Sequence, residues 1–494
     1  MSKEHSEDTR RTIGNLSSTF LVRFARYPFL ALYIFTIPRM LGAYNYGMLA
    51  LVISILMLSS EILTFGVSTV FGRYIPEYII KKETLKLERL ISSYLIFEFL
   101  ISIVLGLTGI ILVFSINQLK NEIIYVIIIF FTVISEVYSG LLFSVLFGLN
   151  YVGKANAVNL FRTIFRLLFL LSLYPILGFT GALLSLLLTP VLSGLYALYS
   201  IQKVIKLKIR KPILKEFLPK LKFGIIIFTP ALLFLFQQQI GPVFLKLFSL
   251  NNSEIGFFDL ANQGFLVLYG LAITGFEALI PISSKFQVTG KGETGIYWLF
   301  MLLRYILPIL LIIVITFYLF GEGIITILLG KQFINIYPIA LIILISVPVW
   351  IIGQLGYVRS VVLLNPKPYI ISTLLSTIVF ILSGLFFINK LGAIGLAIAV
   401  LLSGTVYSVY ISLLYKEMFD NLLSIIKKIF LPAISFLPLL VFKVDSIEIR
   451  IIIFLFSTFL FLGILLKLKI INLKELKQLD IIIQKKIPAE DISE

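Results

Sequence analysis

The chain has 494 residues, of which 59% are hydrophobic and only 14% are charged, and its mean hydropathy is +1.05. Because a soluble chain carries about 25% charged residues, this composition excludes a protein whose main solvent is water and favours one bundle of helices in a lipid bilayer. Cysteine is absent and His5 is the single histidine, which excludes disulfides, thiolate nucleophiles, histidine triads and metal centres built from these residues.

Fourteen apolar segments are each long enough to cross a bilayer, which takes about 20 residues in a helix. In chain order they are 13–38, 46–70, 90–116, 123–148, 157–176, 180–202, 223–247, 256–282, 296–320, 337–358, 369–388, 391–415, 429–443 and 447–466. We therefore predict an all-α polytopic membrane protein with about fourteen transmembrane helices. No short apolar core with a cleavage site follows the polar stretch 1–12, so we expect the first helix to be retained.

The basic residues indicate how these helices cross the membrane. With the N-terminus on the cytoplasmic side, the inner segments hold 30 lysines and arginines and the outer loops hold 7. This asymmetry follows the positive-inside rule, so we predict a multi-pass protein of the cell membrane with both termini in the cytoplasm. It also accounts for the net charge of +17 without a nucleic-acid partner.

Glycines and their neighbours recur at a nearly constant distance along the chain. Gly47 and Gly66 recur 209 residues later as Gly256 and Gly275. At an offset of 214, the recurring residues are Gly178 and Gly181 as Gly392 and Gly395, Thr163 as Thr377, and Tyr196 as Tyr410. Because six crossings restore the starting orientation, we predict two parallel six-helix lobes related by a pseudo-twofold axis along the membrane normal.

The repeat divides the chain into parts. These are a cytoplasmic N-tail (1–12), an N-lobe with helices 1–6 (13–202), a basic cytoplasmic linker (203–222), a C-lobe with helices 7–12 (223–415), helices 13 and 14 (429–466) and a cytoplasmic C-tail (467–494). We interpret the eight basic residues of the linker as a positive-inside signal, with a contact to anionic lipid as the alternative. The C-tail is either an amphipathic helix on the inner leaflet or a solvated tail.

Charged residues inside the predicted helices are the candidate functional residues, because ionisable groups are costly in a bilayer and mark substrate and ion pathways. The bases are Arg23, Arg26, Arg162, Arg166 and Arg304, and the acids are Glu61, Glu98, Glu136, Asp259 and Glu277. The planar fork of arginine binds phosphate at two points and keeps its charge in a low dielectric. We therefore predict that the arginines line a cavity for phosphate and glycan. The alternative is that each arginine pairs with an acid and locks the bundle.

The arginines are distributed unevenly between the two repeats. Arg162 and Arg166 are four residues apart and share one helix face. The residues 214 positions later are Ser376 and Phe380, which are uncharged. The two lobes are thus expected to share a fold but not a charge pattern, as suits a substrate with one anionic end.

The acids and several amides are candidates for ion coupling, ion pairing or cavity lining. Asp259, Asn262 and Gln263 share a face of helix 8, and Gln238 lies in the middle of helix 7. These amides could bind sugar hydroxyls or a coupling cation, or form hydrogen bonds between helices. Asp259 and Glu277 lack a sequence-adjacent base, and a carboxylate that must be neutral to be buried can carry a proton. We expect no cofactor and no metal site; coupling to H⁺ or Na⁺ stays open and would use these carboxylates.

Several short motifs resemble one family of exporters. They are Pro38-Arg39-Met40-Leu41-Gly42, Tyr46-Gly47, Phe65-Gly66-Val67-Ser68-Thr69, Arg73-Tyr74, Leu329-Gly330-Lys331-Gln332-Phe333 and Asn365-Pro366-Lys367-Pro368. Together they resemble O-antigen-type polysaccharide flippases, which belong to the multidrug/oligosaccharidyl-lipid/polysaccharide (MOP) exporter superfamily.

The resemblance implies an alternating-access carrier that moves a polyprenyl-phosphate- or polyprenyl-pyrophosphate-linked oligosaccharide from the inner to the outer leaflet for surface polysaccharide. We expect a monomer that is not an enzyme, with the lipid-linked oligosaccharide, membrane lipids and glycan-assembly enzymes as partners. Two alternatives stay open. A peptidoglycan-precursor flippase would also carry phosphate, whereas a multidrug antiporter of the same superfamily is disfavoured by the internal arginines.

Overall fold

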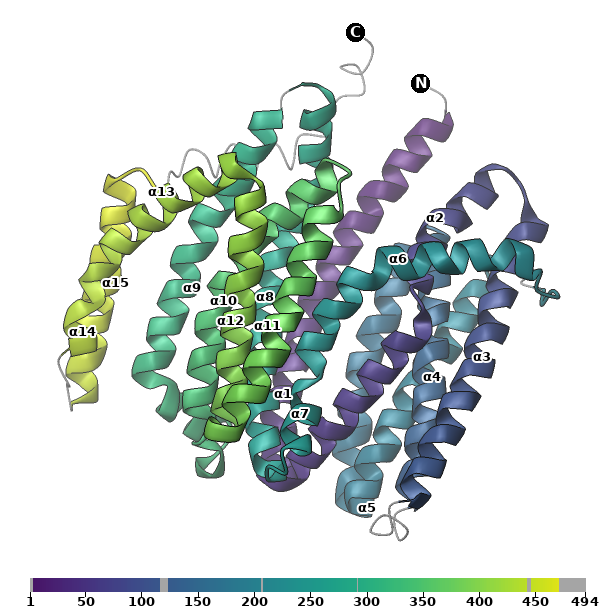
Figure 1. Ribbon diagram of the computed structural model, residues 1–494, viewed down its shortest axis with the longest axis horizontal. Helices are drawn as coiled ribbons and strands as arrows, with labels where there is room; N and C mark the ends of the chain where they lie inside the picture. The colour runs from purple at the N-terminus through teal and green to yellow at the C-terminus, as the bar shows by residue number, and fades with distance from the viewer. Residues whose placement is uncertain (1–2, 116–122, 206–207, 291, 442–445, 471–494) are drawn as a thin grey trace. The chain divides into compact units, whose positions relative to one another are not determined.

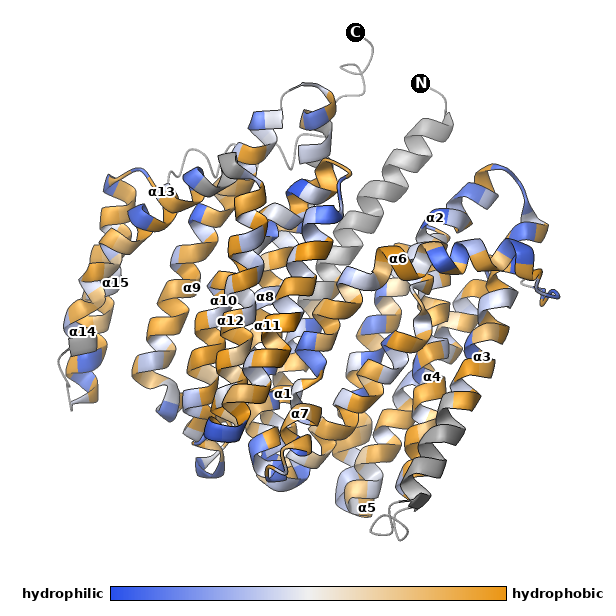
Figure 2. Ribbon diagram, in the orientation of Figure 1, coloured by the Kyte–Doolittle hydropathy of each residue, from blue (hydrophilic) through white to orange (hydrophobic). Residues whose placement is uncertain are grey.

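The computed structural model describes residues 3–115, 123–205, 208–290, 292–441 and 446–470. Every regular element in these ranges is a helix, which confirms the all-α polytopic fold. Among the described residues, eleven helical stretches are long and apolar enough to cross a membrane. In Figure 2 hydrophobic residues cover most of the length of these helices, and hydrophilic residues gather mainly at helix ends and connections.

The chain divides into two compact units. Unit 1 comprises Met1–Gly264, Glu322–Ile343 and Thr377–Leu402, and unit 2 comprises Phe265–Gly321, Leu344–Ser376 and Ser403–Glu494. The first seven helices belong to unit 1, and the last helices belong to unit 2. The helices between them contribute a part to each unit.

The first seven helices are α1 (Lys3–Thr64), α2 (Val67–Ile80), α3 (Thr84–Ser115), α4 (Ile123–Gly148), α5 (Val152–Gln202), α6 (Leu214–Gln239) and α7 (Gly241–Leu247). Within unit 1, α4 packs against α3 and α5, and α2 packs against α4 and α6 (Figure 1). The core between them is aromatic in part: Phe71 and Tyr94 are both fully buried, and their rings meet edge to face at 5.2 Å.

The chain continues through α8 (Asn252–Val288), α9 (Gly292–Leu328), the 3₁₀ turn η2 (Lys331–Phe333), α10 (Ile336–Val362), α11 (Lys367–Leu391) and α12 (Ala393–Leu414). It ends with α13 (Lys416–Ala433), the 3₁₀ turn η3 (Ile434–Phe436), α14 (Leu437–Val441) and α15 (Ile447–Lys467). Within unit 2, α13 and α15 pack against each other and against η3 (Figure 1).

Two helices are far longer than one membrane crossing. α1 has 62 residues and α5 has 51, which at 1.5 Å per residue is about 93 and 77 Å, against a hydrocarbon core of about 30 Å. Each is interrupted by one non-helical glycine, Gly42 (φ 74°) in α1 and Gly178 (φ 57°) in α5. These glycines lie where predicted helices 1 and 2, and 5 and 6, join.

The backbone repeats this local geometry at the predicted offset. Gly392, which follows Gly178 by 214 residues, has a φ of 58°. Gly181 and Gly395 each lie against the backbone carbonyl eight residues earlier, so that an added Cβ would overlap that oxygen. The two segments therefore fold alike locally, while the extent of the two lobes stays a prediction.

The first pair of repeated glycines packs together where α1 crosses α8. A Cβ added at Gly47 would overlap the carbonyl oxygen of Asn252, and one added at Gly256 would lie 3.0 Å from the carbonyl oxygen of Ala43. Asn252 follows Ala43 by the same 209 residues that separate the two glycines. The contact is therefore reciprocal, as in a pair related by a two-fold axis, and only glycine permits so close an approach.

Two helix boundaries differ from those predicted. α1 ends at Thr64, so the predicted span 46–70 contains the break before α2. The predicted span 223–247 is divided at Ile240 between α6 and the short α7. The cause is that hydropathy shows which segment prefers lipid to water, but it does not show where the helix within that segment breaks or changes direction.

Two segments predicted as connections are partly helical. α6 begins at Leu214, inside the basic linker 203–222, and α13 begins at Lys416. The linker is also tied to α3, since the Nε of Arg210 donates to the Oε2 of Glu88 at 2.8 Å. Charged residues lower the hydropathy of such amphipathic helices, so a hydropathy reading places them outside the membrane spans. A lipid contact of the linker stays a prediction.

Candidate functional site

Three of the five predicted arginines lie together in unit 1. Arg26 comes from α1, and Arg162 and Arg166 come from α5, against which α1 packs. The Nε of Arg26 donates a hydrogen bond of 2.9 Å to the Oγ1 of Thr163. Arg162 lies within electrostatic range of both other arginines. We call these three residues the arginine cluster; a role in substrate binding stays a prediction.

Two of the predicted acids accompany the arginine cluster. Arg162 forms a salt bridge with Glu136 of α4, whose side chain is only 4% exposed. Glu61 of α1 lies within electrostatic range of Arg162. Three guanidinium groups thus accompany two carboxylates, so this group of described residues carries more positive than negative charge. For Arg162, the structure therefore shows the ion pair that the alternative interpretation expected of each internal arginine.

Two polar atoms beside the cluster lack partners. The Nε of Arg166 and the hydroxyl of Tyr33 on α1 are buried, and neither has a hydrogen-bond partner among the described residues. The two side chains lie within electrostatic range of each other. Buried donors without a partner are rare and call for an explanation such as a bound ion or water. Here they are two donors available to an anion beside the arginine cluster, and Asp259 also lies within electrostatic range of Tyr33.

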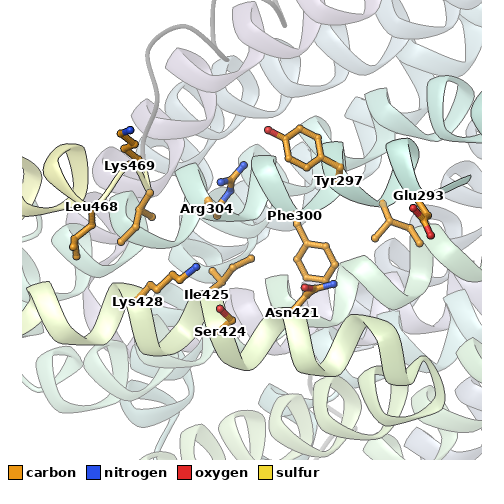
Figure 3. A pocket seen from close by; sticks show the side chains of 12 residues that line it. Glu293, Tyr297, Phe300, Arg304, Asn421, Ser424, Ile425, Lys428, Leu468 and Lys469 are labelled. Atoms are coloured by element: carbon orange, nitrogen blue, oxygen red, sulfur yellow. The ribbon is translucent and has the colours of Figure 1, made fainter. Parts of the chain in front are cut away.

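The other two predicted arginines have separate surroundings. The side chain of Arg23 lies outside the described part of the chain. Arg304 lies on α9 in unit 2, and its guanidinium is 5.6 Å from the ring centroid of Tyr297. It lines a pocket whose other walls are formed by α13 and the end of α15 (Figure 3).

Asp259 belongs to a network of hydrogen bonds between α1, α6 and α8. The hydroxyl of Tyr46 donates to the Oδ2 of Asp259 at 2.6 Å, and the side chain of Gln263 is also hydrogen-bonded to Asp259. The Nδ2 of Asn262 donates to the backbone carbonyl of Gln238 at 2.8 Å. These contacts fit the alternative that the polar face of helix 8 bonds neighbouring helices.

Gln237 and Gln238 of α6 are buried inside unit 1. The Nε2 of Gln237 donates to the Oγ1 of Thr377 on α11 at 2.9 Å. The side chain of Gln238 is 5% exposed, and its Oε1 has no hydrogen-bond partner in the described part of the chain. Of the amides predicted to line a cavity, Gln238 is therefore the one whose buried acceptor has no partner among the described residues.

Glu98 on α3 is the most isolated of the predicted acids. It is fully buried, and neither carboxylate oxygen has a hydrogen-bond partner within the described ranges. Tyr94 and Tyr138 lie within electrostatic range of it. An ionised carboxylate buried without a partner is very costly, which sets Glu98 apart from Glu136 with its salt bridge. Glu277 on α8, by contrast, is partly buried and has an interaction partner.

Sequence analysis did not single out Thr163 and Tyr33 as site residues. The sequence indicated Thr163 only as one of the residues that recur at the offset of 214, where it corresponds to Thr377. Tyr33 follows Arg26 by seven residues, which is two turns along the same helix face, and this spacing was the available signal. No spacing in the sequence indicated which of the five acids pairs with Arg162, because this depends on how α4 and α5 pack against each other.

A family model described as polysaccharide biosynthesis protein matches residues 13–287. No curated protein sequence matches the chain. Among solved structures, the chain is similar to the lipid II flippase MurJ in an inward closed conformation, with a TM-score of 0.68 at 17% identity over 93% of this chain and 100% of that chain.

The chain is also similar to two MATE transporters. One is an inward-facing multidrug resistance MATE family transporter of the MOP superfamily, with a TM-score of 0.63 at 15% identity over 81% of this chain and 98% of that chain. The other is a Vibrio cholerae MATE transporter, with a TM-score of 0.57 at 13% identity over 83% of this chain and 98% of that chain. At these identities the likeness shows the fold, which is that of MOP-superfamily transporters.

Proposed function

The chain belongs to the family of polysaccharide biosynthesis proteins, and on this premise we propose that it is a flippase for a polyprenyl-phosphate- or polyprenyl-pyrophosphate-linked oligosaccharide. It moves this substrate from the inner to the outer leaflet of the cell membrane by alternating access and so supplies surface polysaccharide. The fold of a MOP-superfamily transporter supports the proposal at the level of transport.

The excess of guanidinium groups over carboxylates in the arginine cluster carries the proposal. A phosphate that leaves water must recover its lost hydration, and fixed arginines within apolar helices supply that compensation. Each charge-assisted hydrogen bond contributes about 1.5–3 kcal/mol. The forked geometry of arginine also matches a phosphate at two points.

The salt bridge between Arg162 and Glu136 supplies a way to release the substrate. Without substrate, Glu136 neutralises Arg162. A bound phosphate competes with this carboxylate for the same guanidinium, and the salt bridge forms again once the phosphate leaves. Exchange between two partners keeps the buried arginine compensated at every stage, which limits the cost of moving charge inside the bilayer.

The alternatives differ in what the site must bind. A multidrug antiporter for cationic compounds needs an acidic or apolar site, which the excess of arginine disfavours. A peptidoglycan precursor also carries a pyrophosphate, so the same residues would serve it. Transport of each lipid-linked glycan in turn by the purified protein separates these two substrates.

Replacement of Arg26 tests the proposal. In proteoliposomes with a fluorescent lipid-linked oligosaccharide, we expect Arg26→Ala to reduce the flipping rate at least about tenfold, since it removes charge-assisted hydrogen bonds. Arg26→Lys keeps the charge but loses the two-point geometry, so it should retain partial activity. The control is Arg39→Ala, which changes an exposed arginine on the same helix. A wild-type rate for Arg26→Ala would contradict the proposal.

We propose in addition that transport is coupled to protons through Glu98. Its burial without a hydrogen-bond partner among the described residues supports this, because such an acid binds and releases a proton when its surroundings change. Glu98→Gln should abolish the response of flipping to an imposed pH gradient while leaving the fold intact. If the response persists there but disappears in the double variant Asp259→Asn, Glu277→Gln, the coupling site lies on α8 instead.

A further inference from the structure

A pocket of about 590 Å³ lies in unit 2, where α9, α13 and the end of α15 meet (Figure 3). Its wall on α9 includes Glu293, Tyr297, Phe300 and Arg304, which are spaced at i, i+4, i+7 and i+11 and therefore share one helix face. The pocket is built from residues other than those of the arginine cluster.

The wall on α13 is formed by one face of an amphipathic helix. Asn421, Ser424, Ile425 and Lys428 line it at i, i+3, i+4 and i+7. Ile425 is buried, whereas the two polar residues and Lys428 are exposed. This face therefore presents two hydrogen-bonding groups and one cation to the space between α13 and α9.

The third wall is the turn that ends α15. The N–H of Ile470 donates to the carbonyl of Leu465 at 3.0 Å, and both residues are buried, as in the motif that commonly ends helices with a left-handed residue. Lys469 occupies the left-handed position with a φ of 53°, where glycine is usual. The turn thus holds the backbone of this lysine at the edge of the pocket.

The charges of the pocket are separated along its length. Figure 3 shows Lys469 at one end and Glu293 at the other, with Arg304 and Lys428 on facing helices nearer to Lys469. Three cations thus gather toward one end, while the apolar side chains of Ile425 and Leu468 also face the pocket. A ligand that fits this lining has an anionic head and an apolar body.

The predicted topology puts all three walls at the same side of the membrane. α9 begins at Gly292 within the predicted inner loop 283–295, α13 begins in the inner segment 416–428, and α15 leads into the predicted cytoplasmic C-tail. Beyond the pocket, Phe430 and Leu431 on α13 are 73% and 62% exposed, as expected of a helix that faces lipid at the inner interface.

We propose that this pocket binds the phosphate of a lipid in the inner leaflet. Arg304, Lys428 and Lys469 hold the phosphate, and Asn421 and Ser424 are placed to bond the hydroxyl or ester groups next to it. A phosphate ester reaches this site either from an anionic phospholipid or from a polyprenyl phosphate. The proposal goes beyond the proposed function, because it assigns a second lipid site where α9, a helix of the second predicted lobe, meets the helices that follow that lobe.

The chain carries a natural reporter for this site. It has two tryptophans: Trp298, next to Tyr297 on α9 with ring centroids 5.8 Å apart, and Trp350, which is 1% exposed and stacked on Tyr407. In the Trp350→Phe background, fluorescence reports Trp298 alone. Its quenching by lipids with brominated acyl chains measures how often each lipid lies beside α9 next to the pocket, and the pocket variants below show which part of the quenching belongs to the pocket.

The experiment compares brominated phosphatidylglycerol with brominated phosphatidylcholine in nanodiscs. We expect half-maximal quenching at a fraction of brominated phosphatidylglycerol in the nanodisc lipid that is about tenfold lower than the fraction of brominated phosphatidylcholine needed. The reason is that each well-placed cation contributes a charge-assisted bond to the phosphate. Lys428→Gln and Lys469→Gly should each remove most of this preference. Lys469→Gly also relieves the left-handed backbone, so its loss of binding cannot be attributed to a weakened turn.

A matched control distinguishes binding in the pocket from attraction of anionic lipid to any exposed lysine of α13. Lys427→Gln changes the neighbouring exposed lysine, which does not line the pocket, and should keep the preference. Equal quenching by both lipids, or an equal loss in Lys427→Gln and Lys428→Gln, would overturn the proposal.

Competition identifies the source of the phosphate. Unlabelled phosphatidylglycerol that reverses quenching where polyprenyl phosphate fails assigns the site to a membrane phospholipid, and the converse assigns it to the carrier lipid. If millimolar inorganic phosphate reverses the quenching when no unlabelled lipid is added, the assignment to a lipid would be overturned. Because the quenching needs no transport, this outcome is independent of the outcome for Arg26.

Discussion

The segments around Thr163 in α5 and Thr377 in α11 make the same contact with different donors. The Oγ1 of Thr163 accepts from the Nε of Arg26, and the Oγ1 of Thr377 accepts from the Nε2 of Gln237, both at 2.9 Å. Gln237 follows Arg26 by 211 residues, within the 209–214 offset of the other landmarks. One hydrogen bond between helices is thus made twice, with a cation in the first half and an amide in the second.

The residues around these threonines differ further. Ser376 and Phe380, at the positions equivalent to Arg162 and Arg166, are fully buried. Ser376 donates to the carbonyl of Ser403 at 3.0 Å, and the ring of Phe380 stacks on Phe244 at 6.0 Å. The repeat thus preserves contacts that hold helices together, whereas the arginines at these equivalent positions occur in the first half only.

The largest effect is expected when α5 receives the residues of α11. The triple variant Arg162→Ser, Arg166→Phe, Glu136→Gln should reduce flipping in proteoliposomes by about a hundredfold or more, because two arginines that bind phosphate are lost. Glu136→Gln is included because a buried carboxylate without its arginine would itself destabilise the fold. Glu136→Gln alone removes the salt bridge to Arg162 but keeps both arginines, so it should slow flipping by clearly less than the triple variant does. Near wild-type flipping by the triple variant would show that the charge difference between the halves has no role in transport.

The crossing of α1 and α8 tests whether the two halves are equivalent in packing. Gly47→Ala and Gly256→Ala should each lower the free energy of unfolding by about 1–3 kcal/mol, as overpacking does, since each Cβ meets backbone of the other helix. Equilibrium unfolding in mixed micelles measures this change. Gly264→Ala is the matched control on α8, because no atom lies within 4 Å of its added Cβ. Gly47→Ala should be the more costly, because its Cβ overlaps backbone whereas that of Gly256→Ala lies 3.0 Å from it. A cost at either glycine no larger than that of Gly264→Ala would contradict the close contact.

The smallest effects are expected at the two threonines. Thr163→Val removes the acceptor that holds Arg26 and should slow flipping about tenfold, because a bond to a charged group is lost. Thr377→Val removes a neutral bond to Gln237 and should cost about 0.5–1.5 kcal/mol of stability with an unchanged flipping rate. Flipping rates and unfolding free energies of both variants check this difference; equal losses of transport would contradict it.

Part of the candidate site could be predicted from sequence. Arg26, Arg162 and Arg166 were singled out because arginine inside an apolar helix is rare and costly, and this depends only on local composition. Among the acids, composition alone did not distinguish Glu136, which pairs with Arg162, from Glu98, which has no hydrogen-bond partner in the described ranges. Both are single glutamates in apolar helices, and only their neighbours in space differ.

The sequence by itself determined that this protein is an all-α membrane protein, where its apolar segments lie and which landmarks recur, because hydropathy, helical periodicity and spacing are local properties of a chain. Only the tertiary structure decided that Gly47 meets Gly256, that Arg26 is held by Thr163, and that α9, α13 and the end of α15 enclose a pocket. The physical reason is that these contacts depend on the crossing and rotation of helices that are far apart in the chain. Crossing and rotation follow from the packing of whole helix surfaces, which no single segment specifies.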